Sequence, residues 1–183
     1  MIKYVRHIIF LAILIPFETY SDASVNTEFD YSEGTYTYQY SQQINGSIEQ
    51  IFGVLTDYAK YTRLNSNVQE SRIIGAPGQQ IKRLLKIRQC IFFFCFNLQM
   101  VEEVVQSKFF IESSIVKDES NFLSGLSSWE LVKISNNKTL VRLKASQTPA
   151  FWIPPFIGPP LIKSVLFREL EETFTNLEVL ASS

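Results

Sequence analysis

The stretch that decides the fold is PLIKSVLFRELEETFTNLEVL, residues 160–180 of the 183-residue chain. Its apolar side chains recur at spacings of three and four, the pattern of an amphipathic helix with one buried face. Pro160 suits the first turn of such a helix, where a backbone N–H has no partner within the helix. We therefore expect one long C-terminal helix. Its predicted buried face consists of Ile162, Val165, Leu166, Leu170, Phe174 and Leu177.

The chain before this helix reads as a series of strands. Alternating or apolar segments are separated by turn signals such as Ala76, Pro77 and Gly78, or Asn136 and Asn137. Short connections between consecutive strands favour an antiparallel meander. The seven predicted strands lie at about 35–40, 68–75, 80–90, 95–106, 109–116, 127–135 and 139–148.

A short helical pair is predicted between the first and second strands. Ser47 and Gln50 have the spacing of a capping box at the start of one helix, and a second turn is expected at 61–64. The fold class is therefore α+β, with a seven-stranded curved antiparallel sheet around the long C-terminal helix. In such an arrangement the residues between sheet and helix commonly line a cavity.

This order of elements resembles the helix-grip fold of the START, polyketide cyclase and birch-pollen allergen superfamily, also called SRPBCC. SIEQIF at 47–52, LTDY at 55–58 and SRII at 71–74 are similar to coenzyme Q-binding START-like proteins. SNFLSGLSSW at 120–129 and FWIPP at 151–155 resemble exported members of the polyketide cyclase/dehydrase group. The resemblance implies a helix-grip fold, but no catalytic motif is present to match, and the superfamily includes binders, transfer proteins and enzymes.

The first residues have the features of a secretory signal. Lys3 and Arg6 precede the apolar run IIFLAILIPF at 8–17, and a small-x-small site ends at Ala23. The run is shorter than the roughly 20 residues that span a bilayer, although an uncleaved N-terminal anchor is the alternative. We expect a signal peptide at 1–23 and a START-like helix-grip domain at 24–183. The protein is then exported, to the periplasm if its source is a Gram-negative bacterium and otherwise secreted.

Charge and histidine content exclude several classes of function. The net charge is −1, which argues against a nucleic-acid binder. The one histidine, His7, lies inside the predicted signal, so the domain has none. Ser-His-Asp and Cys-His catalysis and His-ligated zinc are therefore excluded. With two cysteines, a four-thiolate metal site is excluded as well. We expect no metal, no cofactor and a monomer.

The two cysteines, Cys90 and Cys95, bracket a tight turn between two predicted strands. In an exported protein they are expected to form a disulfide, because directly opposed residues of a hairpin lie close enough. A redox-active pair is the alternative, but a C-x4-C spacing in a strand turn has no helix N-terminus to lower a thiol pKa. The disulfide fixes the strand register. The pairs it predicts are Ile87 with Leu98, Leu85 with Met100 and Arg83 with Glu102 on one face, and Lys86 with Gln99, Leu84 with Val101 and Lys82 with Glu103 on the other.

Three apolar connections are predicted to meet at one end of the sheet, because alternate turns of a meander leave from the same end. An exposed apolar patch marks a ligand mouth, a partner surface or a membrane contact, whereas side chains that turn inward would simply close the core. We expect a cavity mouth formed by Ile91, Phe92, Phe93, Phe94, Phe122, Leu123, Phe151, Trp152, Ile153, Phe156 and Ile157.

Strand parity also predicts the wall of the cavity, with a solid core as the alternative. Arg83 and Glu102 fall on this mostly apolar face, either to hold a polar head group or to reach solvent at a strand end. The predicted ligand-binding wall consists of Arg83, Leu85, Ile87, Phe96, Leu98, Met100, Glu102, Ile111, Trp129, Leu131, Val141, Leu143, Leu166, Leu170 and Phe174.

Three functions fit these features. The favoured hypothesis is a non-enzymatic binder or carrier of a lipid-like or isoprenoid-like molecule. The second is a cyclase- or dehydratase-type enzyme that uses non-histidine acid–base groups, namely Glu102, Arg83 and the tyrosines of the first strand. The third is an envelope interaction module whose Phe and Trp rim docks a membrane or a partner protein.

Overall fold

The computed structural model describes residues 25–76, 78–91, 93–153 and 157–182. The predicted signal peptide, residues 1–23, lies outside them. Twelve elements follow one another within these described residues. They are β1 (Asn26–Ser32), β2 (Thr35–Asn45), α1 (Ile48–Thr56), the 3-10 helix η1 (Tyr58–Arg63), β3 (Val68–Ile73), β4 (Ile81–Ile91), β5 (Phe94–Ser107), β6 (Phe110–Ile115), the 3-10 helix η2 (Lys117–Glu119), β7 (Phe122–Ser135), β8 (Lys138–Pro149) and α2 (Pro159–Ala181).

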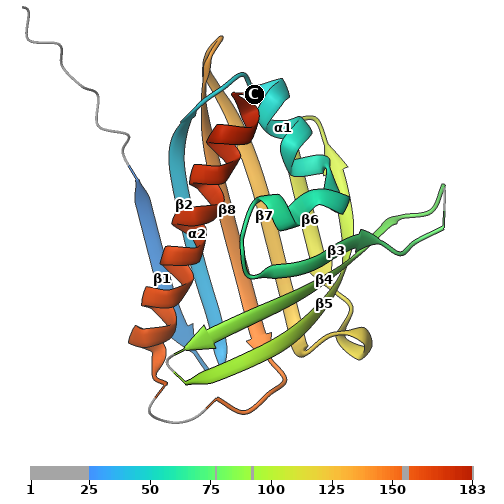
Figure 1. The fold of residues 1–183 in the computed structure, drawn as a ribbon, viewed down its shortest axis with the longest axis vertical. Helices are drawn as coiled ribbons and strands as arrows, with labels where there is room; N and C mark the ends of the chain where they lie inside the picture. Colours follow the sequence, from blue (N-terminus) through green and yellow to red (C-terminus); the bar gives the residue numbers. More distant parts are fainter. Residues whose placement is uncertain (1–24, 77, 92, 154–156, 183) are drawn as a thin grey trace, which may run out of the picture.

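The strands form one curved antiparallel sheet, with α2 lying across its concave face (Figure 1). The sheet has eight strands in the order β1-β2-β8-β7-β6-β5-β4-β3, so the prediction of seven was wrong by one. The strand that the sequence did not reveal is β1, an edge strand. Its residues NTEFDYS are mostly polar and exposed, and Phe29 is its partly buried side chain. Its period-two alternation is limited to Phe29 and Tyr31, which is too short a pattern to identify a strand.

Strand β7 also begins earlier than expected, at Phe122 and not near 127. The intervening serines and glycine suggest a loop, but Ser124 bonds Thr148 and Ser127 bonds Ser113 across the sheet. A Cβ at Gly125 would meet the end of the Ile115 side chain, which would have to move. Phe122 and Leu123 therefore belong to a strand and not to a loop.

The predicted helical pair is not confirmed as a pair of helices. Helix α1 is present, and its capping box of Ser47 and Gln50 is confirmed. The segment after it is the 3-10 helix η1, which is interrupted by non-helical backbone at Lys60. Tyr58 and Tyr61 of η1 are nonetheless buried, so this segment contributes to the core.

Helix α2 divides along its length into two halves with different surroundings. Leu170, Phe174 and Leu177 are buried, and Phe174 packs on Tyr40 with ring centroids 4.5 Å apart. Leu166, nearer the start of the helix, is half-buried. The C-terminal half of α2 therefore closes a solid core, whereas the N-terminal half does not.

The β4–β5 hairpin has the predicted register, including Arg83 opposite Glu102 and Cys90 opposite Cys95. The disulfide is present, with the two Cα atoms 4.0 Å apart. Lys82 pairs with Glu103 in register, but its ammonium group bonds Glu119 of η2 instead, at 2.5 Å.

In the part of the chain that is described, no helix has the length and hydrophobicity needed to cross a bilayer.

Candidate functional site

A cavity of about 340 Å³ lies between the concave face of the sheet and the N-terminal half of α2. Its wall is mostly apolar, and its volume lies in the range of small-molecule sites. Most of the wall predicted from strand parity lines this cavity. These residues are Arg83, Leu85, Ile87, Phe96, Leu98, Met100, Glu102, Trp129, Leu143, Leu166 and Leu170.

Four residues predicted in the wall do not line the cavity. Ile111, Leu131, Val141 and Phe174 are buried in the solid core instead. The Trp129 ring stacks on Phe174 with centroids 5.5 Å apart. Because Trp129 borders the cavity and Phe174 does not, this stack forms the floor. Strand parity gives the face of a residue, but it cannot show how far along the strand the helix presses against the sheet.

The predicted mouth separates into inward and outward side chains. Ile91, Phe122, Phe151 and Ile153 line the cavity. Phe93 is 98 % exposed and Trp152 72 %, and Leu123 and Phe94 are also exposed. Ile157 is buried but does not line the cavity. Phe92 and Phe156 lie outside the described residues.

The described parts of the three connections meet as predicted, at the lower end of the molecule in Figure 1. Phe151 contacts Phe96 of β5, with ring centroids 5.4 Å apart, and Phe122 of β7, at 6.0 Å. The backbone N–H of Ala150 donates to the Asn121 carbonyl. The segments that precede β5, precede β7 and follow β8 therefore form one continuous rim.

Arg83 and Glu102 form a buried ion pair in the cavity wall. Arg83 donates to one carboxylate oxygen, Oε2, from Nη2 at 2.6 Å and from Nε at 3.1 Å. The residues are 4 % and 3 % exposed, so the alternative of a solvent-facing pair at a strand end is wrong. The third nitrogen, Nη1, is buried and has no hydrogen-bond partner. An unpaired buried donor costs about 1–3 kcal/mol, which a suitable acceptor would recover.

Tyrosines surround this ion pair. The Arg83 guanidinium carbon lies 4.5 Å from the centroid of the Tyr61 ring and 5.2 Å from that of Tyr58. Burial raises the pKa of Tyr58 to about 12 despite the opposing charge of Arg83. Burial, followed by the charge of Glu102, also raises the pKa of Tyr38. Tyr38 and Tyr61 both line the cavity, and the Tyr61 hydroxyl donates to the Leu55 carbonyl at 2.6 Å.

One side of the cavity is closed by polar side chains that the sequence did not indicate. Asn67 donates from Nδ2 to Glu169 Oε2 of α2 at 2.5 Å and to Gln89 Oε1 of β4 at 3.0 Å. Asn65 donates to the Glu169 carbonyl at 3.0 Å and to Thr173 Oγ1 at 3.1 Å. We call these five residues the polar seam. They lie on segments far apart in sequence, and isolated amides carry no periodic signal.

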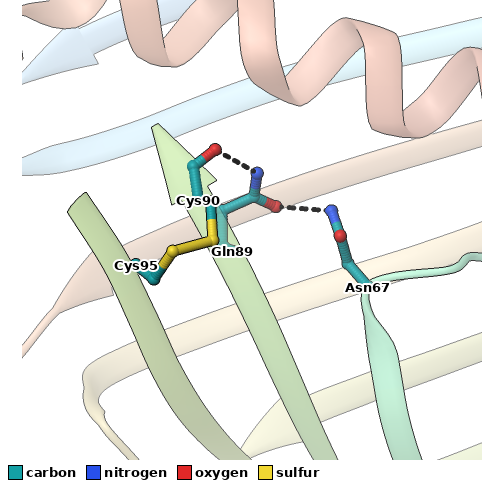
Figure 2. Close-up of a disulfide and its surroundings, with 4 residues drawn as sticks. All are labelled: Asn67, Gln89, Cys90 and Cys95. Atoms are coloured by element: carbon teal, nitrogen blue, oxygen red, sulfur yellow. Dashed lines mark hydrogen bonds between the residues drawn. A yellow bond between two sulfur atoms is a disulfide. The ribbon is translucent and has the colours of Figure 1, made fainter. Parts of the chain in front are cut away.

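The disulfide lies beside the seam, as Figure 2 shows. The Gln89 side chain accepts from Asn67 and donates to the Cys90 carbonyl at 3.5 Å. Gln89 lines the cavity, whereas the neighbouring Cys90 is exposed, as expected for adjacent residues of a strand. The covalent bond thus holds the end of the hairpin at the point where β4 meets the seam.

The sequence and the fold were compared with known proteins. Residues 44–173 match the family described as "Polyketide cyclase / dehydrase and lipid transport". The chain belongs to this family. A search of curated proteins gave no match.

Within residues 25–76, 78–91, 93–153 and 157–182, no group of His, Cys, Asp and Glu side chains could hold a metal ion.

Solved structures with the same fold are similar to this chain at low sequence identity. The Zhui aromatase/cyclase from Streptomyces sp. R1128 has a TM-score of 0.65 at 10 % identity, over 81 % of this chain and 94 % of that one. A START superfamily protein from Mycobacterium smegmatis has 0.64 at 14 %, over 80 % and 97 %. A STAR-related lipid transfer protein from Xanthomonas axonopodis has 0.58 at 13 %, over 85 % and 98 %. The α+β helix-grip-like fold is thus established.

Proposed function

We propose that the protein binds and carries a hydrophobic small molecule, lipid-like or isoprenoid-like, between the sheet and α2. The observation that supports this most is the cavity itself, about 340 Å³ with a largely apolar wall. Its ligand gains roughly 25 cal/mol for each Å² of apolar surface removed from water. Family members include lipid transport proteins, which agrees with such a role.

The ligand is proposed to carry one polar acceptor group, directed at the Arg83–Glu102 pair. Arg83 Nη1 has no partner, although the rest of the guanidinium is bonded. Because Nη1 is fully buried, a carbonyl, carboxylate or hydroxyl oxygen of the ligand would reach it only after a small shift of the neighbouring side chains, and it would then form a charge-assisted hydrogen bond. The apolar remainder would extend along Leu85, Ile87 and Leu98 towards the rim.

Binding of a fluorescent fatty acid to delipidated protein tests this proposal. Ala145 of β8 lines the cavity, so Ala145→Phe should fill part of it and weaken binding about tenfold or more. Val132→Phe is the matched control, because Val132 is exposed on β7 and lies outside the cavity. Circular dichroism verifies that both variants fold. Wild-type protein that takes up neither this probe nor an isoprenoid would overturn the proposal.

Export is proposed together with carriage. It is supported by the apolar run at 8–17 and by the Cys90–Cys95 disulfide, which persists in oxidising compartments. The test is the intact mass of the protein in cell fractions and in the medium. We expect a chain that begins after Ala23, in the periplasm or outside the cell. A full-length chain that stays with the membrane would support the anchor instead.

A cyclase or dehydratase activity is the second candidate, because Glu102 and Tyr38 both line the cavity as possible acid–base groups. A carrier needs the ion pair for orientation alone, whereas an enzyme needs the carboxylate to exchange a proton with its substrate. Mass spectrometry of a bound polyketide or isoprenoid before and after incubation separates the two. Chemical change in the wild type that is absent in Glu102→Gln would favour the enzyme.

A further inference from the structure

The rim of the cavity has two layers. In each of its three segments one side chain points into the cavity and a close neighbour points to solvent. The inner side chains, Ile91, Phe122 and Phe151, are accounted for by the cavity they line. The outer side chains, which we call the outer rim, are Phe93, Leu123 and Trp152, with exposed fractions of 98 %, 48 % and 72 %. Neither the core nor the cavity explains why these three are apolar.

The outer rim consists of three separate apolar side chains, Phe93, Leu123 and Trp152, one from each segment. Phe, Leu and Trp are the apolar residues typical of surfaces that lie in a membrane interface. A protein partner would need a complementary surface that contacts all three at once. Insertion of a few apolar side chains into a bilayer has no such requirement, because lipid surrounds each one separately.

Charge beside the outer rim points to the same occupant. Arg88 lies two residues before Cys90 on the outer face of β4 and is exposed. Lys163 lies in the first turns of α2 and is exposed, with its ammonium group 5.9 Å from the centroid of the Phe29 ring. On the far side of the rim, η2 carries Lys117, Asp118 and Glu119, of which Glu119 is paired with Lys82, and Glu33 lies in the β1–β2 turn at this end of the sheet. Basic side chains next to inserted aromatic residues suit an anionic lipid surface.

We propose that the outer rim docks the mouth of the cavity onto an anionic phospholipid bilayer. Phe93 and Trp152 enter the interfacial region, and Arg88 and Lys163 contact lipid phosphates. The cavity then opens towards the acyl chains, so that an apolar ligand moves between bilayer and protein without crossing water. The purpose of this contact rests on the proposed carrier function, whereas the contact itself does not.

Vesicle flotation of the disulfide-bonded protein tests the docking. Vesicles of phosphatidylcholine with phosphatidylglycerol should carry the wild type, and high salt or omission of phosphatidylglycerol should reduce flotation. The double substitution Phe93→Ser and Trp152→Ser should lower the bound fraction about tenfold or more. The matched control is Val132→Ser with Ile134→Ser, which removes two exposed apolar side chains towards the other end of β7.

Three results would overturn the docking. The first is a wild-type protein that does not float with vesicles of either composition. The second is a rim variant that floats as well as the wild type. The third is a concentration-dependent dimer that the rim substitutions abolish. The fatty-acid probe separates this inference from the proposed function, because it is measured without vesicles. A wild type that floats but takes up no probe would end the carrier proposal and leave the docking intact.

Discussion

Arg83 and Glu102 lie on neighbouring strands of one hairpin and meet inside the cavity wall, where two guanidinium nitrogens donate to a single carboxylate oxygen at 2.6 and 3.1 Å. The aromatic faces of Tyr58 and Tyr61 enclose the guanidinium on its other side. Removing two charges from water is costly, and a neighbouring charge must offset that cost. Such a pair is therefore a sensitive point for both stability and binding.

Removal of Arg83 alone should be strongly destabilising. Arg83→Met leaves the Glu102 carboxylate buried without its cation, and we expect a loss of about 3–5 kcal/mol in the free energy of unfolding. The double variant Arg83→Met with Glu102→Leu should recover most of that loss, because no buried charge remains. Urea denaturation of the single and double variants measures both values. A double variant as unstable as the single one would show that packing around Arg83, and not charge pairing, is what matters.

Much of this pair was predictable from sequence because covalent geometry fixed the register. Once Cys90 and Cys95 are opposed, every other pair of the hairpin follows, and residues two apart share a face. The amphipathic spacing of 160–180 located α2 for a similar reason. Local periodicity and one cross-link therefore determined the wall of the cavity from Arg83 to Met100.

What the sequence could not give depends on distances between elements. In the edge strand β1 only Phe29 and Tyr31 alternate with polar residues, which is too short a pattern to identify a strand in a polar stretch. The floor of the cavity depends on where α2 approaches the sheet, so Phe174 was assigned to the wall although it lies in the core. The polar seam joins Asn67 to Glu169, which lie 102 positions apart. No local pattern reports such a contact.

Loss of the disulfide should be tolerated by the fold. The bond closes a short loop, so Cys90→Ser with Cys95→Ser should lower the free energy of unfolding by about 2 kcal/mol. The native spectrum should be retained, because the β4–β5 pairing extends well beyond the turn. Thermal unfolding with and without reductant gives the value. Native alkylation without reductant should label neither cysteine, and rapid labelling of both would contradict the bond.

Alkaline pH should weaken the fold through Tyr58. Burial raises its pKa from the ordinary value of 10.0 to about 12, so ionisation is easier in the unfolded chain. This contribution to stability is therefore complete below pH 10 and is lost as the pH rises towards 12. Tyr58→Phe lacks this titration, but it loses the hydrogen bond from Tyr58 to Gln106, worth about 1 kcal/mol.

Urea denaturation of wild type and Tyr58→Phe across this pH range provides the measurement. The other buried tyrosines are present in both proteins, so the difference reports Tyr58 together with its coupling to Tyr61. At neutral pH the wild type should be more stable than Tyr58→Phe, and we expect this difference in the free energy of unfolding to shrink as the pH rises above 10. A difference that stays constant up to the highest pH would contradict the raised pKa of Tyr58.

The polar seam should control how fast ligand exchanges. Glu169 of α2 accepts from Asn67 at 2.5 Å, and its carbonyl accepts from Asn65 at 3.0 Å. Glu169→Ala removes the carboxylate bond, and the N-terminal half of α2 is not held by the solid core. We therefore expect fatty-acid probe to leave the variant several-fold faster, with a loss of stability of about 1–3 kcal/mol.

Two variants identify the cause. Glu169→Gln keeps an acceptor oxygen for Asn67 and should restore slow exchange. Glu171→Ala, an exposed change on the same helix, should leave the rate unchanged. Stopped-flow fluorescence gives the rates, and hydrogen exchange shows whether the loop between η1 and β3 loosens in Glu169→Ala. Equal exchange rates in Glu169→Ala and wild type would mean that ligand leaves through the rim alone and that the seam serves only to hold α2.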